Sequence, residues 1–531
     1  MTLLSVQGLD VAINGAPILR GVSFDIAPGQ IVALTGESGS GKSMTALATM
    51  GLLPQGAVAA GKLLLEGRDI LTTPETALCA LRGNAMGMVF QEPMTALNPV
   101  HSIGDQVAET LRIHGTDSRA EARRIARDML ARVGLPDDRF PLSRFPHELS
   151  GGQRQRVVIA MAIARRPRLL IADEPTTALD VTTQAQILDL LRGLVADFGM
   201  GLMMITHDLA VVAKMADRIV VMKDGAVVEQ GETRQILHHM RHPYTRALLA
   251  ASTHRPKLSP RITKDDPILT VTDAVRSYAE PRKTLFGPRT VRRAVDGVSL
   301  TIHNRERVGL VGESGCGKST LTRAILGLEP LQGGTITAFG HDIANLPPAL
   351  RSGLQVVFQD PYGSFNPRHK VARLIAEPYH LLPRPPDSAR READIAQALT
   401  EVGLTPGDAD KYIHEFSGGQ RQRIAIARAL ILRPDLIVFD EAVSALDVSV
   451  RAQVLDLLAR ISASHGLAYL FISHDLSVVR SVTDRVLVMK SGKIVEQGET
   501  RAVFSNPQHP YTRALIAAAP VLPALHQEET A

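Results

Sequence analysis

The sequence predicts an α/β fold that occurs twice in one chain, and three observations lead to this prediction. The 531 residues contain an internal repeat, in which Asp173-Glu174 recurs as Asp440-Glu441, 267 residues later. Short apolar runs such as 169–172 end at a glycine or an aspartate and precede helical patterns, as buried parallel strands do. Each copy also contains one glycine-rich segment of the pattern G-x-x-x-x-G-K-S. Strands that alternate with helices in this way indicate two α/β domains in tandem.

The repeat also sets the expected domain boundaries. We expect a first domain over residues 1–253, a linker over 254–267, a second domain over 268–522 and a tail over 523–531. The linker is expected because its segment is polar and rich in proline and charged residues. The strongly charged pattern over 110–132 predicts a helical insertion with an exposed face.

The composition is that of an ordinary globular protein. The chain has 59 Lys and Arg against 54 Asp and Glu, which gives a net charge of +5, and 45% of its residues are hydrophobic. These values exclude intrinsic disorder, collagen and a coiled coil. With only Cys79 and Cys316, a disulfide scaffold and a zinc or iron–sulfur site of four protein thiolates are excluded as well. We expect neither a secretory signal nor a membrane span, because no apolar run reaches about 18 residues.

The two glycine-rich segments predict two phosphate-binding loops, over residues 36–43 and 312–319. Their glycines allow backbone N–H groups to turn toward phosphate oxygens, and the helix that follows adds its positive N-terminal end. Lys42 and Lys318 are expected to reach the β- and γ-phosphates. The candidate nucleotide-binding residues of the two loops are Gly36, Gly39, Gly41, Lys42, Ser43, Gly312, Gly315, Gly317, Lys318 and Ser319.

An acidic pair follows one apolar run in each copy. Asp173 and Asp440 occupy the last position of their runs, from which a carboxylate can hold Mg²⁺ together with a loop serine. The expected Mg²⁺ ligands are Asp173, Ser43, Asp440 and Ser319. The adjacent Glu174 and Glu441 are candidates for the general base that activates the attacking water. A single Asp-Glu dipeptide of this kind is more often a strand end with two solvated acids. Here the dipeptide occurs twice, each time in a copy that also contains a phosphate loop.

Further motifs resemble those of ABC ATPases. The segments 149–153 (LSGGQ) and 416–420 (FSGGQ) are similar to the signature of that family, and each serine stands 23 residues before its aspartate. A serine that caps a helix, followed by two glycines, offers N–H groups and a helix dipole to a γ-phosphate. The candidate residues of the two signatures are Ser150, Gly151, Gly152, Gln153, Ser417, Gly418, Gly419 and Gln420.

Three shorter motifs complete the resemblance. Gln91 and Gln359 are similar to the Q-loop glutamines, and the resemblance implies that they contact the nucleotide and Mg²⁺. His207 and His474 are similar to the switch histidines, which would act in catalysis with Glu174 and Glu441. The segments 178–180 and 445–447, both ALD, are similar to D-loops.

The resemblance implies two ATP molecules sandwiched between the two copies in head-to-tail contact. Each site would combine the phosphate loop, glutamine, acidic pair and histidine of one copy with the signature of the other. Neither copy has lost one of these residues, so we expect two hydrolytic sites. The family usually stacks adenine on an aromatic residue before the phosphate loop, and alignment of the copies places Tyr278 there in the second and Ile13 in the first. We therefore expect weaker nucleotide binding at the first site.

Three features are similar to the importer group for oligopeptides, dipeptides and nickel. The element HPYTRAL occurs at 242–248 and again at 509–515, without a chemical role that the sequence reveals. The segments after the Q-loop glutamines, 92–100 and 360–368, match that group, and the linker between the copies is short. The nearest resemblance is to fused tandem ATPases of peptide-type importers, such as those for glutathione or microcin C.

This resemblance implies an ATP-hydrolysing subunit on the cytoplasmic face of a bacterial inner membrane. Its partners would be two integral membrane permeases and a solute-binding protein, with ATP and Mg²⁺ as ligands and no nucleic acid. We expect no iron–sulfur cluster, because residues 250–267 lack the cysteines that some relatives carry there. A ribosome-associated tandem ABC factor is the alternative, and a non-hydrolytic nucleotide-dependent clamp is another. The sequence identifies neither the cargo nor whether both sites turn over equally.

Overall fold

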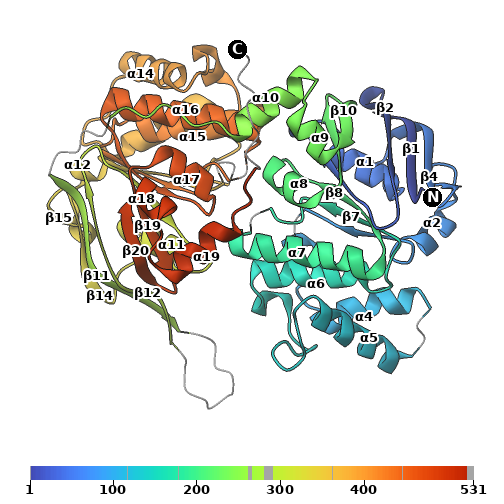
Figure 1. The fold of residues 1–531 in the computed structure, drawn as a ribbon. Helices are drawn as coiled ribbons and strands as arrows, with labels where there is room; N and C mark the ends of the chain where they lie inside the picture. The colour runs from blue at the N-terminus through green and yellow to red at the C-terminus, as the bar shows by residue number, and fades with distance from the viewer. Residues whose placement is uncertain are drawn as a thin grey trace, which may run out of the picture.

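The computed structural model describes residues 2–91, 93–115, 118–177, 179–260, 266–279, 291–360, 363–444 and 446–522. Two halves of similar architecture lie side by side, the first coloured blue to green and the second yellow to red (Figure 1). Each half contains one antiparallel sheet, one mainly parallel sheet and a group of helices. The predicted tandem α/β fold is therefore confirmed.

The first half has a four-stranded antiparallel sheet in the order β2-β1-β4-β5. Its six-stranded sheet has the order β10-β9-β3-β8-β7-β6, and only β10 runs antiparallel to its neighbour. Every residue of β3, β7 and β8 is buried, which explains why these strands are continuous apolar runs. The strands are β1 Leu4–Ile13, β2 Ala16–Ile26, β3 Ile31–Thr35, β4 Ala57–Leu65, β5 Arg68–Asp69, β6 Met86–Val89, β7 Leu169–Asp173, β8 Gly201–Ile205, β9 Arg218–Lys223 and β10 Ala226–Glu232.

The second half repeats both sheets with the same neighbours. Its antiparallel sheet has the order β12-β11-β14-β15, and its six-stranded sheet the order β16-β17-β18-β13-β19-β20. The strands are β11 Pro267–Ala279, β12 Val291–His303, β13 Arg307–Val311, β14 Gly333–Ala338, β15 His341–Asp342, β16 Leu354–Val357, β17 Leu436–Asp440, β18 Ala468–Ile472, β19 Arg485–Lys490 and β20 Lys493–Glu499.

The helices cover the parallel sheets and form a helical group beside each of them. In the first half they are α1 Lys42–Thr49, α2 Glu75–Leu81, α3 Pro93–Ala96, α4 Ile103–Ile113, α5 Arg119–Arg132, α6 Gly151–Ile163, α7 Val181–Phe198, α8 Leu209–Met215, α9 Thr233–His238 and α10 Pro243–Ser252. In the second half they are α11 Lys318–Ile325, α12 Pro348–Arg351, α13 Val371–Ala376, α14 Ser388–Glu401, α15 Gly418–Leu430, α16 Val448–His465, α17 Leu476–Val482, α18 Thr500–Ser505 and α19 Pro510–Ala518. Short 3-10 helices span Pro146–Glu148, Ile343–Asn345, Glu377–Leu381, Pro406–Asp410 and Ile413–Glu415.

The charged segment over 110–132, predicted to be a helical insertion, includes parts of two helices. It contains the end of α4 and all of α5, which pack against each other and against α6. The break follows from the local sequence: Gly115 has a φ of +93°, and the Ser118 side chain accepts a hydrogen bond from the Glu121 amide to begin α5.

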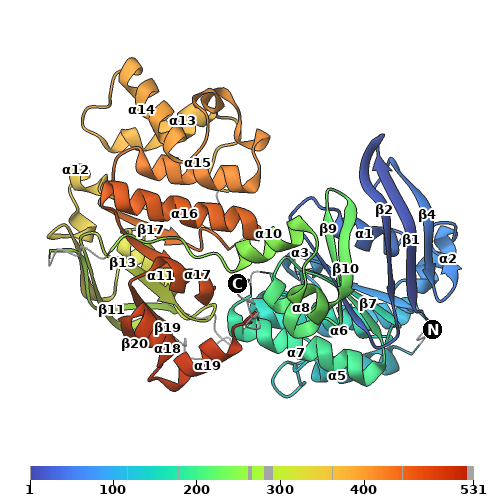
Figure 2. The same cartoon turned by 45° about the horizontal axis from the view of Figure 1, so that its top comes forward.

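The two halves meet through helices from both ends of the repeat. Helix α10 of the first half lies beside α16 of the second, and α19 of the second lies beside α7 of the first (Figure 2). Val181, the first residue of α7, is 5% exposed and belongs to a hydrophobic cluster of the second half. Between α10 and β11 the described residues 253–260 form neither helix nor strand. Among the helices that the structure describes, none is long and apolar enough to span a bilayer.

Candidate functional site

The first phosphate loop connects β3 to α1 and lies against β9. Gly36 has a φ of +152°, and a Cβ atom there would lie 2.2 Å from the Met222 carbonyl oxygen. Only glycine fits this position, because the backbone conformation is strained for other residues and the neighbouring strand leaves no space. Gly312 repeats the arrangement against Met489, also at 2.2 Å.

The loop lysines are buried and point back into their own loops. Lys42 Nζ donates hydrogen bonds to the carbonyl oxygens of Gly36 at 2.9 Å and Glu37 at 2.8 Å. Burial lowers the pKa of Lys42, and nearby carboxylates, Glu174 first, oppose this shift only in part. Lys318 makes the equivalent bonds in the second half, at 2.7 and 2.9 Å. Each ammonium group is therefore held inside the curve of its own loop.

The acidic pair of each half ends a central strand. Asp173 is the last residue of β7 and Asp440 the last of β17. The next residue in each half has a left-handed backbone conformation, with a φ of 46° at Glu174 and 51° at Glu441. Such strain in a residue other than glycine is typical of functional sites.

Three side chains fix the carboxylate of Glu174. Gln91 Nε2 donates to it at 2.8 Å and Thr177 Oγ1 at 2.9 Å, while His207 Nδ1 lies 3.1 Å from Oε1. Burial alone would raise the pKa of Glu174, but His207, with contributions from Thr177 and Lys42, lowers it to about 2. The carboxylate is therefore ionised at neutral pH.

The second half arranges the same groups more loosely. His474 Nδ1 lies 3.4 Å from the Glu441 carboxylate and, against the effect of burial, lowers its pKa. Ser444 replaces Thr177 and donates to the backbone carbonyl of Glu441, at 2.9 Å. Within the part of the chain that the structure describes, Gln359 makes no hydrogen bond to Glu441 that would match the bond from Gln91.

The donors around Asp173 fit a hard divalent cation. Its Oδ1 atom is buried and has no hydrogen-bond partner among the described residues. Burial raises the pKa of Asp173, while the Ser43 side chain and Lys42 lower it. An unpartnered carboxylate oxygen beside a serine hydroxyl is the oxygen donor set that Mg²⁺ prefers.

The signature segments begin helices, as their sequence indicates. Ser150 is the N-cap of α6 and accepts from the Gln153 amide at 3.3 Å, while the Gln153 side chain accepts from the Ser150 amide at 3.0 Å. Ser417 and Gln420 form the same reciprocal pair at the start of α15. A Cβ atom at Gly152 would lie 2.2 Å from Thr183 Cγ2, so this glycine permits close packing of α6 against α7.

Hydrogen bonds join each phosphate loop to the D-loop of the other half. The Ser38 amide donates to Asp447 Oδ1 at 2.9 Å, and the Ser314 amide donates to Asp180 Oδ2 at 3.3 Å. Thr182 adds a bond to Glu313 at 3.0 Å. The leading alanines of both D-loops lie outside the described residues.

The strand positions proposed to face adenine differ between the halves. Tyr278 pairs with Arg292 across the antiparallel sheet, and Ile13 pairs with Ala16 at the matching position. The Tyr278 ring lies 5.0 Å from the Arg276 guanidinium carbon, and its hydroxyl donates to Glu329. The aligned positions therefore correspond in register but not in chemistry.

Sequence reasoning missed two groups of site residues. Thr177 supports Glu174, and the repeat could have identified it because Ser444 occupies the same place. Tyr244 and Tyr511 each accept a hydrogen bond from a phosphate-loop amide. Only the recurrence of HPYTRAL pointed to them, since the contacts span 207 and 198 residues.

Comparison with models of protein families identifies the family of this chain. The family model described as "ABC transporter" matches residues 19–177 and 295–444, more than half of the chain. The chain belongs to the ABC transporter ATPase family. A second family model, "Oligopeptide/dipeptide transporter, C-terminal region", matches residues 228–274 and 495–530.

Individual relatives match this ABC ATPase over nearly its whole length. It is 50% identical to "Peptidoglycan transport ATP-binding protein YejF" of Agrobacterium fabrum, over 97% of this chain and 96% of that protein. It is 48% identical to "Glutathione import ATP-binding protein GsiA" of Shigella dysenteriae, over 98% of this chain and 90% of that protein. The Escherichia coli K12 protein of the same name is 47% identical, over the same shares.

These findings confirm that the chain is an ATP-hydrolysing ABC protein of the importer type. The family model covers both phosphate loops and both acidic pairs, so each half carries an ATPase core. The comparisons favour the importer interpretation over the ribosome-associated alternative, which none of the relatives named above supports.

Proposed function

We propose that this ABC ATPase powers the import of peptides or peptide-like solutes through separate membrane permeases. One observation carries the proposal: full-length relatives near 50% identity are named for peptidoglycan transport and glutathione import. Both C-terminal elements also match the oligopeptide and dipeptide transporter region. The proposed partners are two permeases and a solute-binding protein, and the proposed location is the cytoplasmic face of the inner membrane.

The proposed boundaries of the two halves are 1–253 and 268–522, around the 254–267 linker, while the predicted 523–531 tail lies outside the described residues. The two halves would form an intramolecular ATPase dimer. The hydrogen bonds from Ser38 to Asp447 and from Ser314 to Asp180 support this arrangement, because each links one phosphate loop to the opposite half. Since both halves share one chain, their effective concentration favours association within a single molecule. Each signature would then complete the site of the opposite half.

In each proposed site the phosphate loop positions ATP and the acidic pair supplies the chemistry. Lys42 and Lys318 would hold the β- and γ-phosphates and stabilise the charge that develops on them. Glu174 and Glu441 would accept the proton of the attacking water, while His207 and His474 orient these carboxylates. The capped turns at Ser150 and Ser417 would direct N–H groups at the γ-phosphate of the opposite site.

Mg²⁺ would be held by Asp173 and Ser43 in the first site and by Asp440 and Ser319 in the second, with Gln91 and Gln359 nearby. Bound there, the ion would neutralise phosphate charge during transfer. Tyr278 would provide a stacking face for adenine in the second site, where Ile13 provides only apolar contact in the first.

The proposal is tested by purifying the tagged full chain from gently solubilised cells and identifying the proteins that accompany it. We expect two permeases with several membrane spans, together with a solute-binding protein. Cells that express the tag alone are the control. Ribosomal proteins or DNA-repair factors in place of permeases would contradict the transport function and leave the ATPase assignment intact. Stimulation of ATP hydrolysis by the reconstituted permeases and peptide-loaded binding protein would then identify the cargo class.

A further inference from the structure

The two HPYTRAL elements fold into the same turn at the start of a helix. In the first half, Glu229 accepts hydrogen bonds from the amides of Arg241 at 2.8 Å and His242 at 3.2 Å. His242 is the N-cap of α10, and its Nδ1 accepts from the Tyr244 amide at 3.2 Å. Pro243 occupies the first helical position, for which its fixed φ is suited. The turn therefore fixes the direction of the Tyr244 side chain.

The second half builds the turn in the same way. Glu496 accepts from the amides of Gln508 at 2.7 Å and His509 at 3.0 Å, and His509 Nδ1 accepts from the Tyr511 amide at 3.1 Å. Pro510 again begins the helix, α19. Two copies of one motif have thus kept a carboxylate, a capping histidine and a tyrosine in one arrangement.

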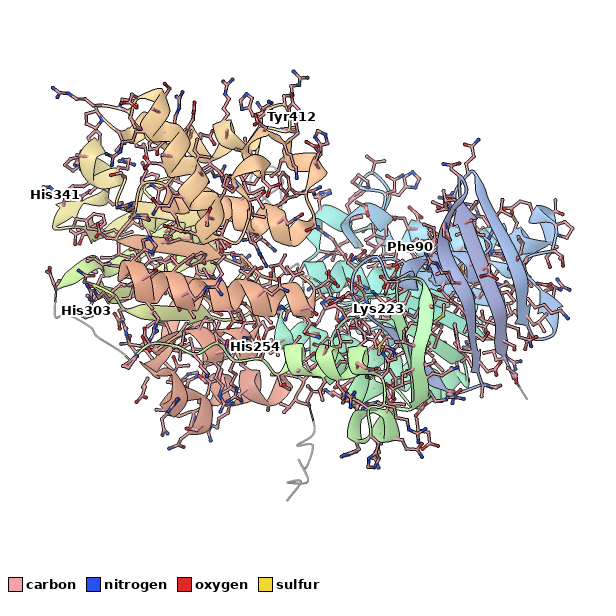
Figure 3. The ribbon with its side chains drawn as sticks, turned by 90° about the horizontal axis from the view of Figure 1, so that it is seen from above. Phe90, Lys223, His254, His303, His341 and Tyr412 are labelled. Carbon is pink, nitrogen blue, oxygen red and sulfur yellow. The ribbon has the colours of Figure 1, made fainter. Side chains whose placement is uncertain are left out.

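Each tyrosine reaches the phosphate loop of its own half. The Glu37 amide donates to the Tyr244 hydroxyl at 2.9 Å, and the Glu313 amide donates to the Tyr511 hydroxyl at 3.0 Å. A lysine ammonium covers each ring, Lys223 at 5.2 Å and Lys490 at 4.6 Å from the ring centroids (Figure 3 labels Lys223). Each ring is therefore contacted at its hydroxyl by a loop amide and over its face by a lysine.

The amide that each tyrosine binds is the first after the leading glycine of the loop. Such a loop offers several of its amides to phosphate, so a loop amide that points elsewhere needs another acceptor. Burial, together with the carboxylates of Glu37 and Asp447, raises the pKa of Tyr244 to about 12. The hydroxyl thus stays neutral and keeps its proton while its oxygen accepts from the amide.

The same helices connect the loops to the opposite half. Helix α10 packs against α16, and His254, just beyond α10, lies 2.8 Å from Asp456 of α16, at the boundary between the halves (Figure 3). The amide next to Glu37, that of Ser38, is held by Asp447 at the start of α16. Two adjacent amides of one loop are therefore anchored by an element that docks on the other half and by that other half itself.

We propose that Tyr244 and Tyr511 are positioning residues, which hold the first turn of each phosphate loop in the conformation that accepts ATP. This inference rests on the proposed roles of the two loops and assigns a function to the HPYTRAL elements. The tyrosines act through the loop backbone and do not touch the phosphates. Their loss affects ATP binding more than the chemical step.

The test replaces both residues with phenylalanine, which removes the two hydroxyls and keeps the rings. In Y244F/Y511F we expect the KM for ATP and the dissociation constant of a fluorescent ATP analogue to rise about tenfold, as when one partnered amide loses its acceptor. We expect kcat to stay within about twofold of the wild-type value, because the groups that act in the transition state are intact.

The matched control is Tyr379→Phe, which removes a hydroxyl that donates to Asp394 at 3.0 Å in the helical group, far from both loops in the sequence. This variant should bind ATP as the wild type does. The single variants Y244F and Y511F give the same readout if the double variant is unstable. Wild-type ATP affinity in Y244F and Y511F, or a loss of kcat with unchanged KM, would overturn the proposal. Because the assay uses the purified chain alone, its outcome is independent of permeases and cargo.

Discussion

The two halves of this ABC ATPase share the residues of the phosphate loop and the strand-end acidic pair. They differ at the rim of the proposed nucleotide site, which is the strand position held by Ile13 in the first half and Tyr278 in the second. Both have a buried loop lysine, an Asp-Glu pair at a strand end and a histidine beside the glutamate. One amide of each phosphate loop also donates a hydrogen bond to the aspartate of the opposite D-loop. Phosphate transfer depends on these groups, and both halves retain them, although the second half holds its glutamate more loosely.

At the rim, the second half is charged and the first is apolar. Tyr278 lies between Arg276 and Glu329, and Arg292 donates to the Gly315 carbonyl oxygen at 2.9 Å. In the first half, Ile13 and Ala16 occupy the positions that match Tyr278 and Arg292. From this difference we expect two sites with the same chemistry but unequal affinity for the nucleotide.

The largest expected effect tests whether Glu174 and Glu441 act as general bases in the two halves. Replacement of both bases, in E174Q/E441Q, should lower the steady-state rate of ATP hydrolysis by about 10²- to 10⁴-fold, the usual contribution of a general base. The two single variants should lose activity to a similar extent. The exposed Glu392→Gln is the control and should hydrolyse ATP normally. Hydrolysis by the double variant at the wild-type rate would show that these residues are not the bases.

The next effect distinguishes the two D-loops. Asp180 accepts from the Thr183 amide and from the hydroxyls of Thr182 and Thr183, whereas Asp447 makes no capping bond to its helix. Loss of an N-cap costs about 1 kcal/mol, so Asp180→Ala should lower the melting temperature by roughly 2–4 °C. Asp447→Ala should lower it less, as differential scanning calorimetry would reveal. Equal shifts in melting temperature for the two variants would contradict this difference between the halves.

A smaller effect concerns the rim. Tyr278→Ala should weaken ATP binding at the second site about fivefold, given aromatic stacking energies near 1 kcal/mol, while Ile13→Ala should change the first site less. Each site is measured by titration with a fluorescent ATP analogue in a chain whose other loop carries Lys→Ala. Equal ATP affinities at the two sites of the otherwise unchanged chain would contradict the proposed asymmetry.

The smallest effect concerns the one substitution between the loops themselves, Ser40 against Cys316. Burial raises the pKa of the Cys316 thiol, so iodoacetamide should label it more slowly than the exposed Cys79. Cys316→Ser should leave kcat and KM nearly unchanged, because the first half functions with serine. Cys79→Ser is the matched control, and a loss of activity in C316S alone would mark a further functional difference between the halves.

Local chemistry explains how much of the molecule the sequence could predict. The loops, the capped signature turns and the strand-end acids follow from patterns of a few residues, and the structure has them at the expected positions. The turn preference of Gly115 and the capping preference of Ser118 also predict the break between α4 and α5. The charge pattern alone does not show this break. Strand β11 begins at Pro267, the last residue of the predicted linker, because proline is tolerated at the first position of a strand.

Contacts between distant residues could not be read in this way. The bond from Glu37 to Tyr244 spans 207 residues and the bond from Ser38 to Asp447 spans 409. These contacts depend on how the C-terminal helices and the two halves pack, which no local pattern encodes. The repeat helped only by showing that HPYTRAL occurs twice.

The most direct test of the account is the number of ATP molecules that one chain retains when hydrolysis is blocked. E174Q/E441Q would be incubated with labelled ATP and Mg²⁺, separated from free nucleotide, and its mass measured by light scattering. The account predicts two ATP molecules in a particle with the mass of a single chain. One ATP per chain, or retention only in a particle of two chains, would contradict two composite sites formed within one molecule.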